Sequence, residues 1–265
     1  MAAEIRLSKR LTAIAEMVNT EGSIAQGGSG GYCLCDVGTD HAHIPIRLLL
    51  DGTIDHAIAM DVIEGPLEKA RENIERYGVS DMVTLRLSDG LDAYEPGECR
   101  GLVIAGMGGR IMSKILTREP EKSLDFEELI LQPQADPEYV RRALRGLGLY
   151  IDRETVVLED NKYYPVIHAV RSPQEEPKWG ESPETDAEAL RTLHEEAEDL
   201  FGPALLKERD AMLRSYLLWQ KGVNDRILYS LRRANDSSSS VSEKKAQILR
   251  KDELIRAALD YFDAE

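Results

Sequence analysis

Hydrophobic and polar positions along the first two thirds of the chain follow the periods of strands and helices in turn. Short apolar runs that end near Asp, Gly or Pro predict strands at 32–37, 56–62, 83–89, 101–107 and 128–133. Between these runs, apolar positions with a helical spacing predict helices at about 45–52, 65–78, 109–119 and 137–148. A further amphipathic helix, at about 7–18, precedes the first strand.

Two more strands, 149–160 and 162–171, are joined by the turn residues Glu-Asp-Asn-Lys and predict an antiparallel hairpin. Five strands that alternate with helices, followed by this hairpin, predict an α/β fold. The sheet is expected to be doubly wound, mostly parallel and seven-stranded, with an antiparallel edge. In such a sheet, ligands bind at the carboxyl ends of the parallel strands.

The remaining third of the chain has a different pattern. The segment 172–186 is rich in Pro and Glu and predicts a boundary between a domain at 1–172 and a second at 173–265. Two long helical patterns follow, 187–234 with a Gly-Pro interruption at 202–203, and 241–262, and NDSSSS (235–240) joins them. They predict an antiparallel helical hairpin of the coiled-coil type. The Gly/Ser/Gln-rich stretch 22–31 precedes its strand and lacks the Lys-Ser/Thr of a P-loop, so we expect a flexible connector there.

Composition favours an ordinary globular protein of the cytoplasm. The chain is 42% hydrophobic and 31% charged, and no apolar run approaches the roughly 18 residues that span a bilayer. The first helix carries charges throughout, unlike a secretion signal. Cys33 and Cys35 lie two apart in an apolar strand and Cys99 is distant, so we expect reduced, packed thiols.

Charge is distributed unevenly along the chain. The formal net charge of −15 argues against indiscriminate binding of nucleic acid. Acidic residues predominate in 173–202, but basic residues outnumber acidic ones in 203–256. This basic stretch is compatible with local contact to phosphates, and equally with long helices that carry mixed charge in solvent.

Three acidic residues follow successive predicted strands. Asp36, Asp61 and Asp89 end the first, second and third strands, and a glycine lies within a few residues of each. An adenosine-containing cofactor needs an acid after the second strand for its ribose hydroxyls, and an acid after the third can accept the adenine amino group. Each acid alone has an alternative role as a helix cap or loop residue, but three in register favour the cofactor.

The first turn, DVGTDHAH, decides between cofactors. A dinucleotide presses its pyrophosphate against a glycine-rich turn at a helix N-terminus, and this turn has Thr39, Asp40 and His41 where further glycines would stand. S-adenosylmethionine has no phosphate and carries a cationic sulfonium and a cationic amino group. A turn lined with carboxylates therefore favours S-adenosylmethionine over NAD.

Several motifs together resemble one enzyme family. They are DVGTDHAHIP, AMDVIEGP, IAGMGG (104–109), ILQP (130–133), LSKRL (7–11) and GPALLKERD (202–210). The set is similar to the bacterial tRNA adenine-N1 methyltransferases that modify position 22, the TrmK family, over nearly the whole chain. The resemblance implies a class I, Rossmann-like methyltransferase fold, S-adenosylmethionine as methyl donor and tRNA as substrate. His43 and Gln134 depart from the Tyr and Asn common in the family, so roles at these two positions do not transfer.

The resemblance and the chemistry of the turn together give candidate site residues. For catalysis they are Asp40, His41 and His43, with Asp40 as the carboxylate that stabilises charge on the adenine or takes a proton from its amine. For the donor they are Asp36, Gly38, Thr39, Asp61, Val62, Asp89, Gly90, Ala105, Gly106 and Met107. For the tRNA they are Lys9, Arg10, Arg110, Lys114, Gln132 and Pro133, with Arg141, Arg142, Arg145 and the basic stretch of the hairpin as further candidates.

Alternatives stay open for these residues. Asp40 is also suited to cap a helix that starts near Pro45, the glycines around Met107 are also suited to tight strand-to-helix packing, and each basic residue alone fits a solvated helix face. His-Ala-His beside aspartates suggests a metal, but no third ligand cluster follows, so we expect none. Other hypotheses are a different RNA or a small molecule as acceptor, or a non-catalytic coiled-coil binding protein. We expect a monomer without membrane contact.

Overall fold

The computed structural model describes residues 5–18, 31–171, 186–234 and 239–263. The chain divides into two compact units, Met1–Glu175 and Glu176–Glu265. The segments that the sequence marks as connectors or boundary, 22–31, 172–186 and 235–240, lie largely outside the described residues. Within the described residues, no helix has the length and apolar character that crossing a membrane requires.

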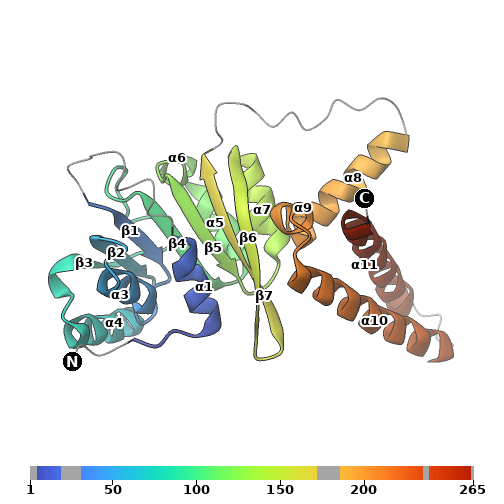
Figure 1. The fold of residues 1–265 in the computed structure, drawn as a ribbon, viewed down its shortest axis with the longest axis horizontal. Helices are drawn as coiled ribbons and strands as arrows, with labels where there is room; N and C mark the ends of the chain where they lie inside the picture. Colours follow the sequence, from blue (N-terminus) through green and yellow to red (C-terminus); the bar gives the residue numbers. More distant parts are fainter. Residues whose placement is uncertain (1–4, 19–30, 172–185, 235–238, 264–265) are drawn as a thin grey trace. The chain divides into compact units, whose positions relative to one another are not determined.

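The first unit is built on a seven-stranded sheet, as predicted (Figure 1). Its strands are β1 (Cys33–Val37), β2 (His56–Asp61), β3 (Val83–Leu87), β4 (Gly101–Met107), β5 (Glu128–Pro133), β6 (Leu149–Glu159) and β7 (Lys162–Arg171). The spatial order is β3-β2-β1-β4-β5-β7-β6. The first five strands run parallel, and β7 is antiparallel to both β5 and β6. The strand order reverses between β1 and β4, which is where a doubly wound sheet opens a crevice for ligands.

Helices cover both faces of this sheet. They are α1 (Lys9–Met17), α3 (His43–Leu50), α4 (Glu64–Tyr77), α5 (Gly109–Arg118), α6 (Pro120–Ser123) and α7 (Pro137–Gly146), with the 3₁₀ helix η1 (Ser80–Met82) before β3. The sequence did not predict α6 and η1, because four and three residues are too few to show a helical period. Helix α3 begins at His43, two residues before the predicted start, so the turn after β1 is shorter than expected.

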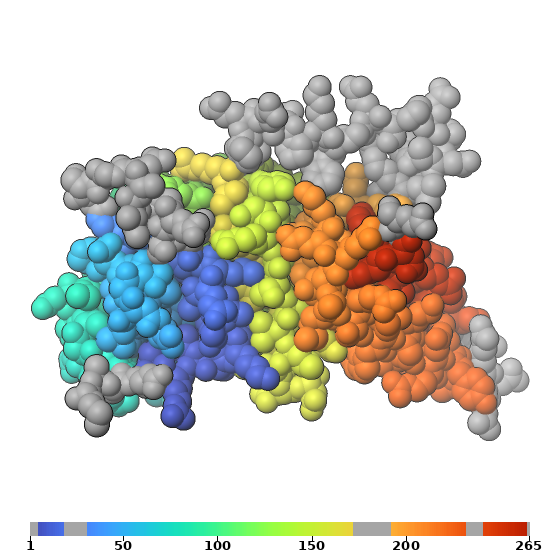
Figure 2. Space-filling view, viewed as in Figure 1, coloured from blue at the N-terminus to red at the C-terminus, as the bar shows by residue number. Residues whose placement is uncertain are grey.

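Alternate residues of the strands pack into two separate hydrophobic cores, one on each face of the sheet. Leu34 of β1 packs with α1, α3 and α4 on one face, and Cys35 packs with α5 and α7 on the other. This period of two follows from the pleat of the strand. Helix α1 contacts α3 on one side and the β6–β7 hairpin on the other, an arrangement visible on the face in Figure 2. The N-terminal helix is therefore part of the core of the first unit.

The second unit is helical. It contains α8 (Asp186–Phe201), α9 (Pro203–Lys207), α10 (Ala211–Ala234) and α11 (Ser239–Asp263). The predicted interruption at 202–203 is present, with Gly202 at a φ of 106° ahead of Pro203. A second break, at 208–210, was not predicted. Arg209 has a φ of 54°, and Asp210 Oδ1 accepts a hydrogen bond from Leu213 N at 2.7 Å, which caps α10.

The predicted hairpin of α10 and α11 is joined by a third helix. Helix α11 packs against both α10 and α8. Arg250 Nη2 lies 2.7 Å from Glu196 Oε2, and the Tyr261 hydroxyl donates to Glu198 Oε1 at 3.0 Å. Sequence reasoning gave α8 only as the start of one long helix, because a period alone does not say which helices pack together.

Candidate active site

The turn after β1 has a strained backbone. Gly38, Asp40 and Ala42 all have positive φ, at 75°, 51° and 56°. For a residue with a Cβ this conformation costs about 1–2 kcal/mol. The main-chain N–H groups of Gly38 and Thr39 both donate to the carbonyl oxygen of Met60, each at 2.9 Å, and hold the turn against the end of β2. Strain maintained in this way is typical of a functional site.

Asp36 is buried beneath this turn. Burial raises the pKa of its carboxyl group to about 7, although a hydrogen bond from the Thr39 hydroxyl, 2.6 Å from Asp36 Oδ2, acts in the opposite direction, and Asp61 raises it further. A buried carboxyl group that titrates near neutrality gains its charge readily when a cation approaches. Asp36 therefore favours a positively charged ligand.

Asp61 links two strand ends. Its Oδ2 accepts from Asp40 N at 3.2 Å and its Oδ1 accepts from Ile63 N at 3.0 Å. Because each carboxylate oxygen has two lone pairs, both atoms keep an acceptor site. Its neighbours in the chain, Val62 and Ile63, are largely exposed although apolar, and so offer an apolar surface next to the carboxylate. The pair of acceptors beside an apolar surface suits a ribose and its attached base.

Asp89 follows β3 on the same edge of the sheet. Its carboxylate is 66% exposed, and Oδ2 lies 3.0 Å from Nη1 of Arg118 in α5. Gly90 follows with a φ of 65°. Arg118 also contacts Asp92, so it anchors the loop after β3. The sequence did not single out Arg118, because a lone arginine at the end of a helix carries no motif.

The end of β4 meets the turn after β1. Gly106 has a φ of 79°, and the pairing of β4 with β5 shifts register between Ala105 and Met107. This bulge turns Met107 toward Gly38, where an added Cβ would lie 2.7 Å from Met107 Cε. The structure thus brings together two motifs, DVGT and IAGM, that are far apart in the chain. The alternative role for these glycines, tight packing between strand and helix, applies to Gly109. A Cβ at this position would lie 2.0 Å from the carbonyl oxygen of Asp136, so only glycine fits there.

Asp40, His41 and His43 form a cluster at the turn, in which Asp40 is exposed and both histidines are partly buried. The Asp40 side chain is 69% exposed, and its Oδ1 lies 3.3 Å from His41 Nε2. The two imidazole rings stack with centroids 5.5 Å apart. Burial and the neighbouring His41 lower the pKa of His43, so this ring is neutral at neutral pH, although Asp40 acts in the other direction. Ala42 occupies the N-cap of α3 without a side-chain hydrogen bond, so the alternative role of Asp40 as the cap is not observed.

Two of the candidates for tRNA contact, Arg10 and Gln132, are held within the fold. Arg10 Nη1 donates to Oε1 of the buried Gln132 at 3.1 Å, and its guanidinium lies 5.3 Å from the ring centre of Tyr164. Gln132 Nε2 in turn donates to the carbonyl of Pro133 at 2.9 Å. This chain of contacts places Arg10 at the carboxyl end of β5, beside β4. The sequence gave no signal for Tyr164.

The remaining basic candidates differ in exposure. Arg110 stacks over the Tyr139 ring and its Nε lies 2.9 Å from Asp136 Oδ2, with the side chain 64% exposed. Lys9 and Lys114 are exposed. Arg141 is a correction, because its side chain is only 1% exposed and its Nε lies 2.8 Å from Glu154 Oε1. A buried, paired guanidinium is not available to a phosphate on the surface, so Arg141 stabilises the fold instead.

Metal binding finds no support in the described part of the chain, where no three His, Cys, Asp or Glu side chains are grouped to hold an ion. The site is thus a carboxylate-lined turn at the switch point between β1 and β4. Beside this turn lie the partly exposed cluster of Asp40, His41 and His43, an apolar surface after β2 and an anchored loop after β3. This arrangement lies at the carboxyl ends of the strands and at the switch point of the sheet, which is where doubly wound α/β folds bind their ligands.

Comparison with known proteins assigns the chain to a family. Residues 7–167 match the family described as the methyltransferase domain. The match spans more than half of the chain, which therefore belongs to this methyltransferase family.

The chain is similar over its whole length to enzymes that act on one tRNA position. It is 28% identical over 258 residues to the tRNA (adenine(22)-N(1))-methyltransferase of Bacillus subtilis, covering 97% of this chain and 99% of that one. The crystal structure of the B. subtilis m1A22 tRNA methyltransferase TrmK has a TM-score of 0.75 at 25% identity, covering 97% of this chain and all of that one. A putative tRNA (m1A22) methyltransferase of Streptococcus pneumoniae, solved with S-adenosyl-L-methionine, has a TM-score of 0.70 at 30% identity, covering 96% of this chain and 100% of that one.

Proposed function

We propose that this protein transfers a methyl group from S-adenosylmethionine to N1 of adenine 22 in tRNA. The observation that carries the proposal is the strained turn Gly38–Ala42, which lies beside Met107 and between the carboxylates of Asp36 and Asp61. Similarity across both units to tRNA (adenine(22)-N(1))-methyltransferases supports the choice of acceptor.

The residues present fit the donor. S-adenosylmethionine, when bound, supplies a methyl group on a cationic sulfur. The buried carboxyl of Asp36, whose pKa burial raises to about 7, favours its cationic part. Asp61 keeps acceptor sites for ribose hydroxyls, and Val62 and Ile63 offer an apolar surface to the adenine. Gly38 allows Met107 to lie close to the turn, because a Cβ there would collide with the end of the Met107 side chain.

The acceptor base meets the cluster of Asp40, His41 and His43 at the turn. N1 of adenine is a neutral nitrogen that gains positive charge as it attacks the methyl carbon, so an anionic group nearby lowers the barrier. The Asp40 carboxylate is exposed and lies at the same turn that holds the donor. It stabilises the growing charge or takes a proton from the exocyclic amine. His43, neutral at neutral pH, lines the turn without adding a competing cation.

N1 lies on the Watson–Crick edge, so the adenine must leave its pair before it reaches Asp40. Exposed basic side chains on the first unit, Lys9, Arg110 and Lys114, suit contact with the tRNA backbone. In the second unit, Lys207, Arg214, Arg226, Lys244 and Lys245 are exposed on α9, α10 and α11. We assign to these residues the role of holding the tRNA. We further propose that the protein acts as a monomer and in the cytoplasm.

The experiment has two arms. Calorimetry with S-adenosylmethionine, and with NAD as a matched control, should give binding only to the first. Incubation with a methyl-labelled donor should then label unmodified bacterial tRNA but not free adenosine. Binding of NAD alone would remove the donor assignment, and labelling of adenosine alone would move the protein to a small-molecule acceptor.

A further inference from the structure

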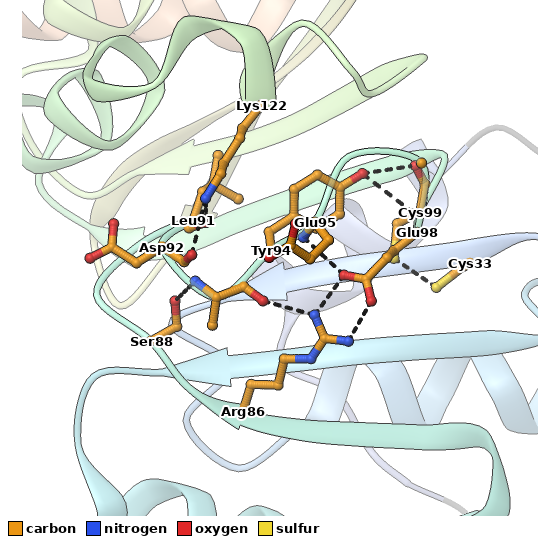
Figure 3. Close-up of polar contacts among 12 residues, drawn as sticks. Cys33, Arg86, Ser88, Leu91, Asp92, Tyr94, Glu95, Glu98, Cys99 and Lys122 are labelled. Carbon is orange, nitrogen blue, oxygen red and sulfur yellow. Dashed lines mark hydrogen bonds and ion pairs between the residues drawn. The ribbon is translucent and has the colours of Figure 1, made fainter.

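Two cysteine thiols that are far apart in the sequence touch on the side of the first unit remote from the turn. Cys33 is the first residue of β1, and Cys99 closes the loop between β3 and β4 (Figure 3). Their sulfur atoms are 2.7 Å apart. The main-chain N–H of Arg100 donates to the carbonyl oxygen of Cys33 at 2.9 Å, which fixes the two backbones side by side. A disulfide bond requires about 2.05 Å between sulfurs, so a small side-chain rotation suffices to form one.

The two thiols differ in reactivity. A hydrogen bond from Cys99 lowers the pKa of Cys33, with a smaller contribution from the guanidinium of Arg86, and these outweigh burial and the carboxylate of Glu98. The same hydrogen bond, together with burial, raises the pKa of Cys99. Cys33 is also partly exposed, whereas Cys99 is buried. Since the thiolate is the reactive form, Cys33 reacts first with a reagent from solvent and Cys99 is in place to resolve the product.

Polar contacts hold the loop that ends at Cys99 in a fixed shape. Arg86 donates to both oxygens of Glu98, each at 2.6 Å, and the main-chain N–H of Ala93 donates to the Ser88 hydroxyl at 3.0 Å (Figure 3). The Tyr94 hydroxyl donates to the carbonyl of Cys99 at 3.3 Å. These contacts keep Cys99 beside Cys33 and do not depend on the methylation reaction.

We propose that Cys33 and Cys99 are a modification site that a peroxide oxidises to an intramolecular disulfide. The Cys33 thiolate attacks one oxygen of the peroxide; an S–O bond forms, the O–O bond breaks, and the leaving oxygen takes a proton to become water or an alcohol. The Cys99 sulfur then attacks Cys33 sulfur; the S–S bond forms, the S–O bond breaks, and hydroxide leaves with the proton of Cys99 as water. The two sulfurs together lose two electrons, which reduce the peroxide.

The disulfide would join the start of β1 to the far end of the loop that carries Asp89 and Gly90. A covalent closure of so long a stretch of chain restricts the unfolded state and stabilises the folded one. The oxidised protein is therefore expected to unfold at a higher temperature than the reduced protein. The proposal does not rest on the proposed function, because neither thiol contacts the turn after β1.

The test treats reduced full-length protein with hydrogen peroxide, alkylates the remaining thiols and maps the peptides by mass spectrometry. Trypsin cleaves after Arg10, Arg47, Arg86 and Arg100, so Cys99 lies on a separate peptide from Cys33. The expected product is a cross-link between these two peptides, lighter by two hydrogens and reversed by dithiothreitol. The tryptic peptide that contains Cys33 also contains Cys35. A second digestion with chymotrypsin, which cleaves after Leu34, separates these two cysteines and shows which of them is cross-linked.

Two variants sharpen the result. Cys35→Ala, the matched control at a buried thiol of the same strand, should keep the cross-link and the rise in unfolding temperature. Cys99→Ala should show neither the cross-link nor the rise in unfolding temperature. In this variant Cys33 should be oxidised further, to sulfinic or sulfonic acid, which dithiothreitol does not reduce. A cross-link through Cys35, a disulfide between two chains, or full alkylation of Cys33 and Cys99 after peroxide would overturn the proposal.

Discussion

The carboxylate of Asp61 accepts a hydrogen bond from the main-chain N–H of Asp40, with 3.2 Å between Oδ2 and the nitrogen. The end of β2 therefore fixes the turn that follows β1, and the residue proposed to bind the donor's ribose also positions the residue proposed for catalysis. Two effects of Asp61 are thus coupled, and experiments must separate donor affinity from turnover.

Asp61→Ala should weaken the binding of S-adenosylmethionine. The substitution removes the acceptors for the ribose and releases the turn, and hydrogen bonds to a charged group contribute about 1.5–3 kcal/mol each, or roughly 10- to 100-fold in affinity. Calorimetry measures the change directly. Glu68→Ala, at an exposed acid of α4, is the control. Equal donor affinity in wild type and Asp61→Ala would remove the ribose assignment.

Asp40→Asn should lower turnover while leaving donor affinity nearly unchanged. Asn tolerates the positive φ of this position as well as Asp does, so the turn keeps its shape and only the negative charge is lost. The expected loss in kcat is about 10²–10⁴-fold, as for general acid–base groups. Single-turnover labelling of tRNA measures it, with Asp51→Asn at the end of α3 as the control. A variant with normal kcat would assign the chemistry to another group.

Donor affinity should depend on pH through Asp36. Burial raises the pKa of this carboxyl to about 7, and a cationic ligand binds its ionised form. Affinity is therefore expected to be constant above pH 7 and to fall as the pH drops below it. Calorimetry at pH 6 and pH 8 tests this, and Asp36→Asn should bind weakly at both. An affinity that rises toward low pH would contradict the role of Asp36.

The stability of the first unit should depend on pH through His168. Burial alone lowers the pKa of this histidine, but hydrogen bonds to Asp152 Oδ1 at 2.5 Å and to Glu128 Oε2 at 2.7 Å outweigh burial and raise it. A raised pKa in the folded state means that the stabilisation is fully present below the unfolded pKa, 6.5, and is lost as the pH rises through the folded value.

Urea unfolding between pH 6 and pH 9 checks this dependence. His168→Gln should remove the dependence and lower the free energy of unfolding by about 3–5 kcal/mol at pH 6, since the buried Glu128 and the partly buried Asp152 lose their cationic partner. His56→Gln, at the exposed start of β2, serves as the matched control. Stability that increases from pH 6 to pH 9 in the wild type would show that His168 is neutral in the folded protein.

The sheet could be predicted from sequence because its strands are short apolar runs bounded by Asp, Gly and Pro, and the hairpin turn carries Asp160 and Asn161, both with positive φ. The packing of α8 onto α11 could not be predicted, since a helical period identifies a face but not its partner. The break at Arg209 was missed because Glu-Arg favours a helix and the cap at Asp210 depends on tertiary context.

Part of the candidate site could also be predicted from the sequence. The acids at strand ends could be identified because parallel strands align their carboxyl ends. The contact of Arg10 with Gln132 joins residues 122 positions apart and has no local pattern, and Arg118 supports Asp89 from a different helix. The burial of Arg141 was also hidden, because its helix carries exposed arginines on neighbouring positions.

The position that receives the methyl group tests the account most directly. Two transcripts of one tRNA, differing only by A22→G, are incubated with the protein and S-adenosylmethionine, then digested and analysed by mass spectrometry. The account predicts 1-methyladenosine at position 22 of the first transcript and no methylation of the second. Methylation of both transcripts, or a methyl group on an atom other than N1, would contradict it.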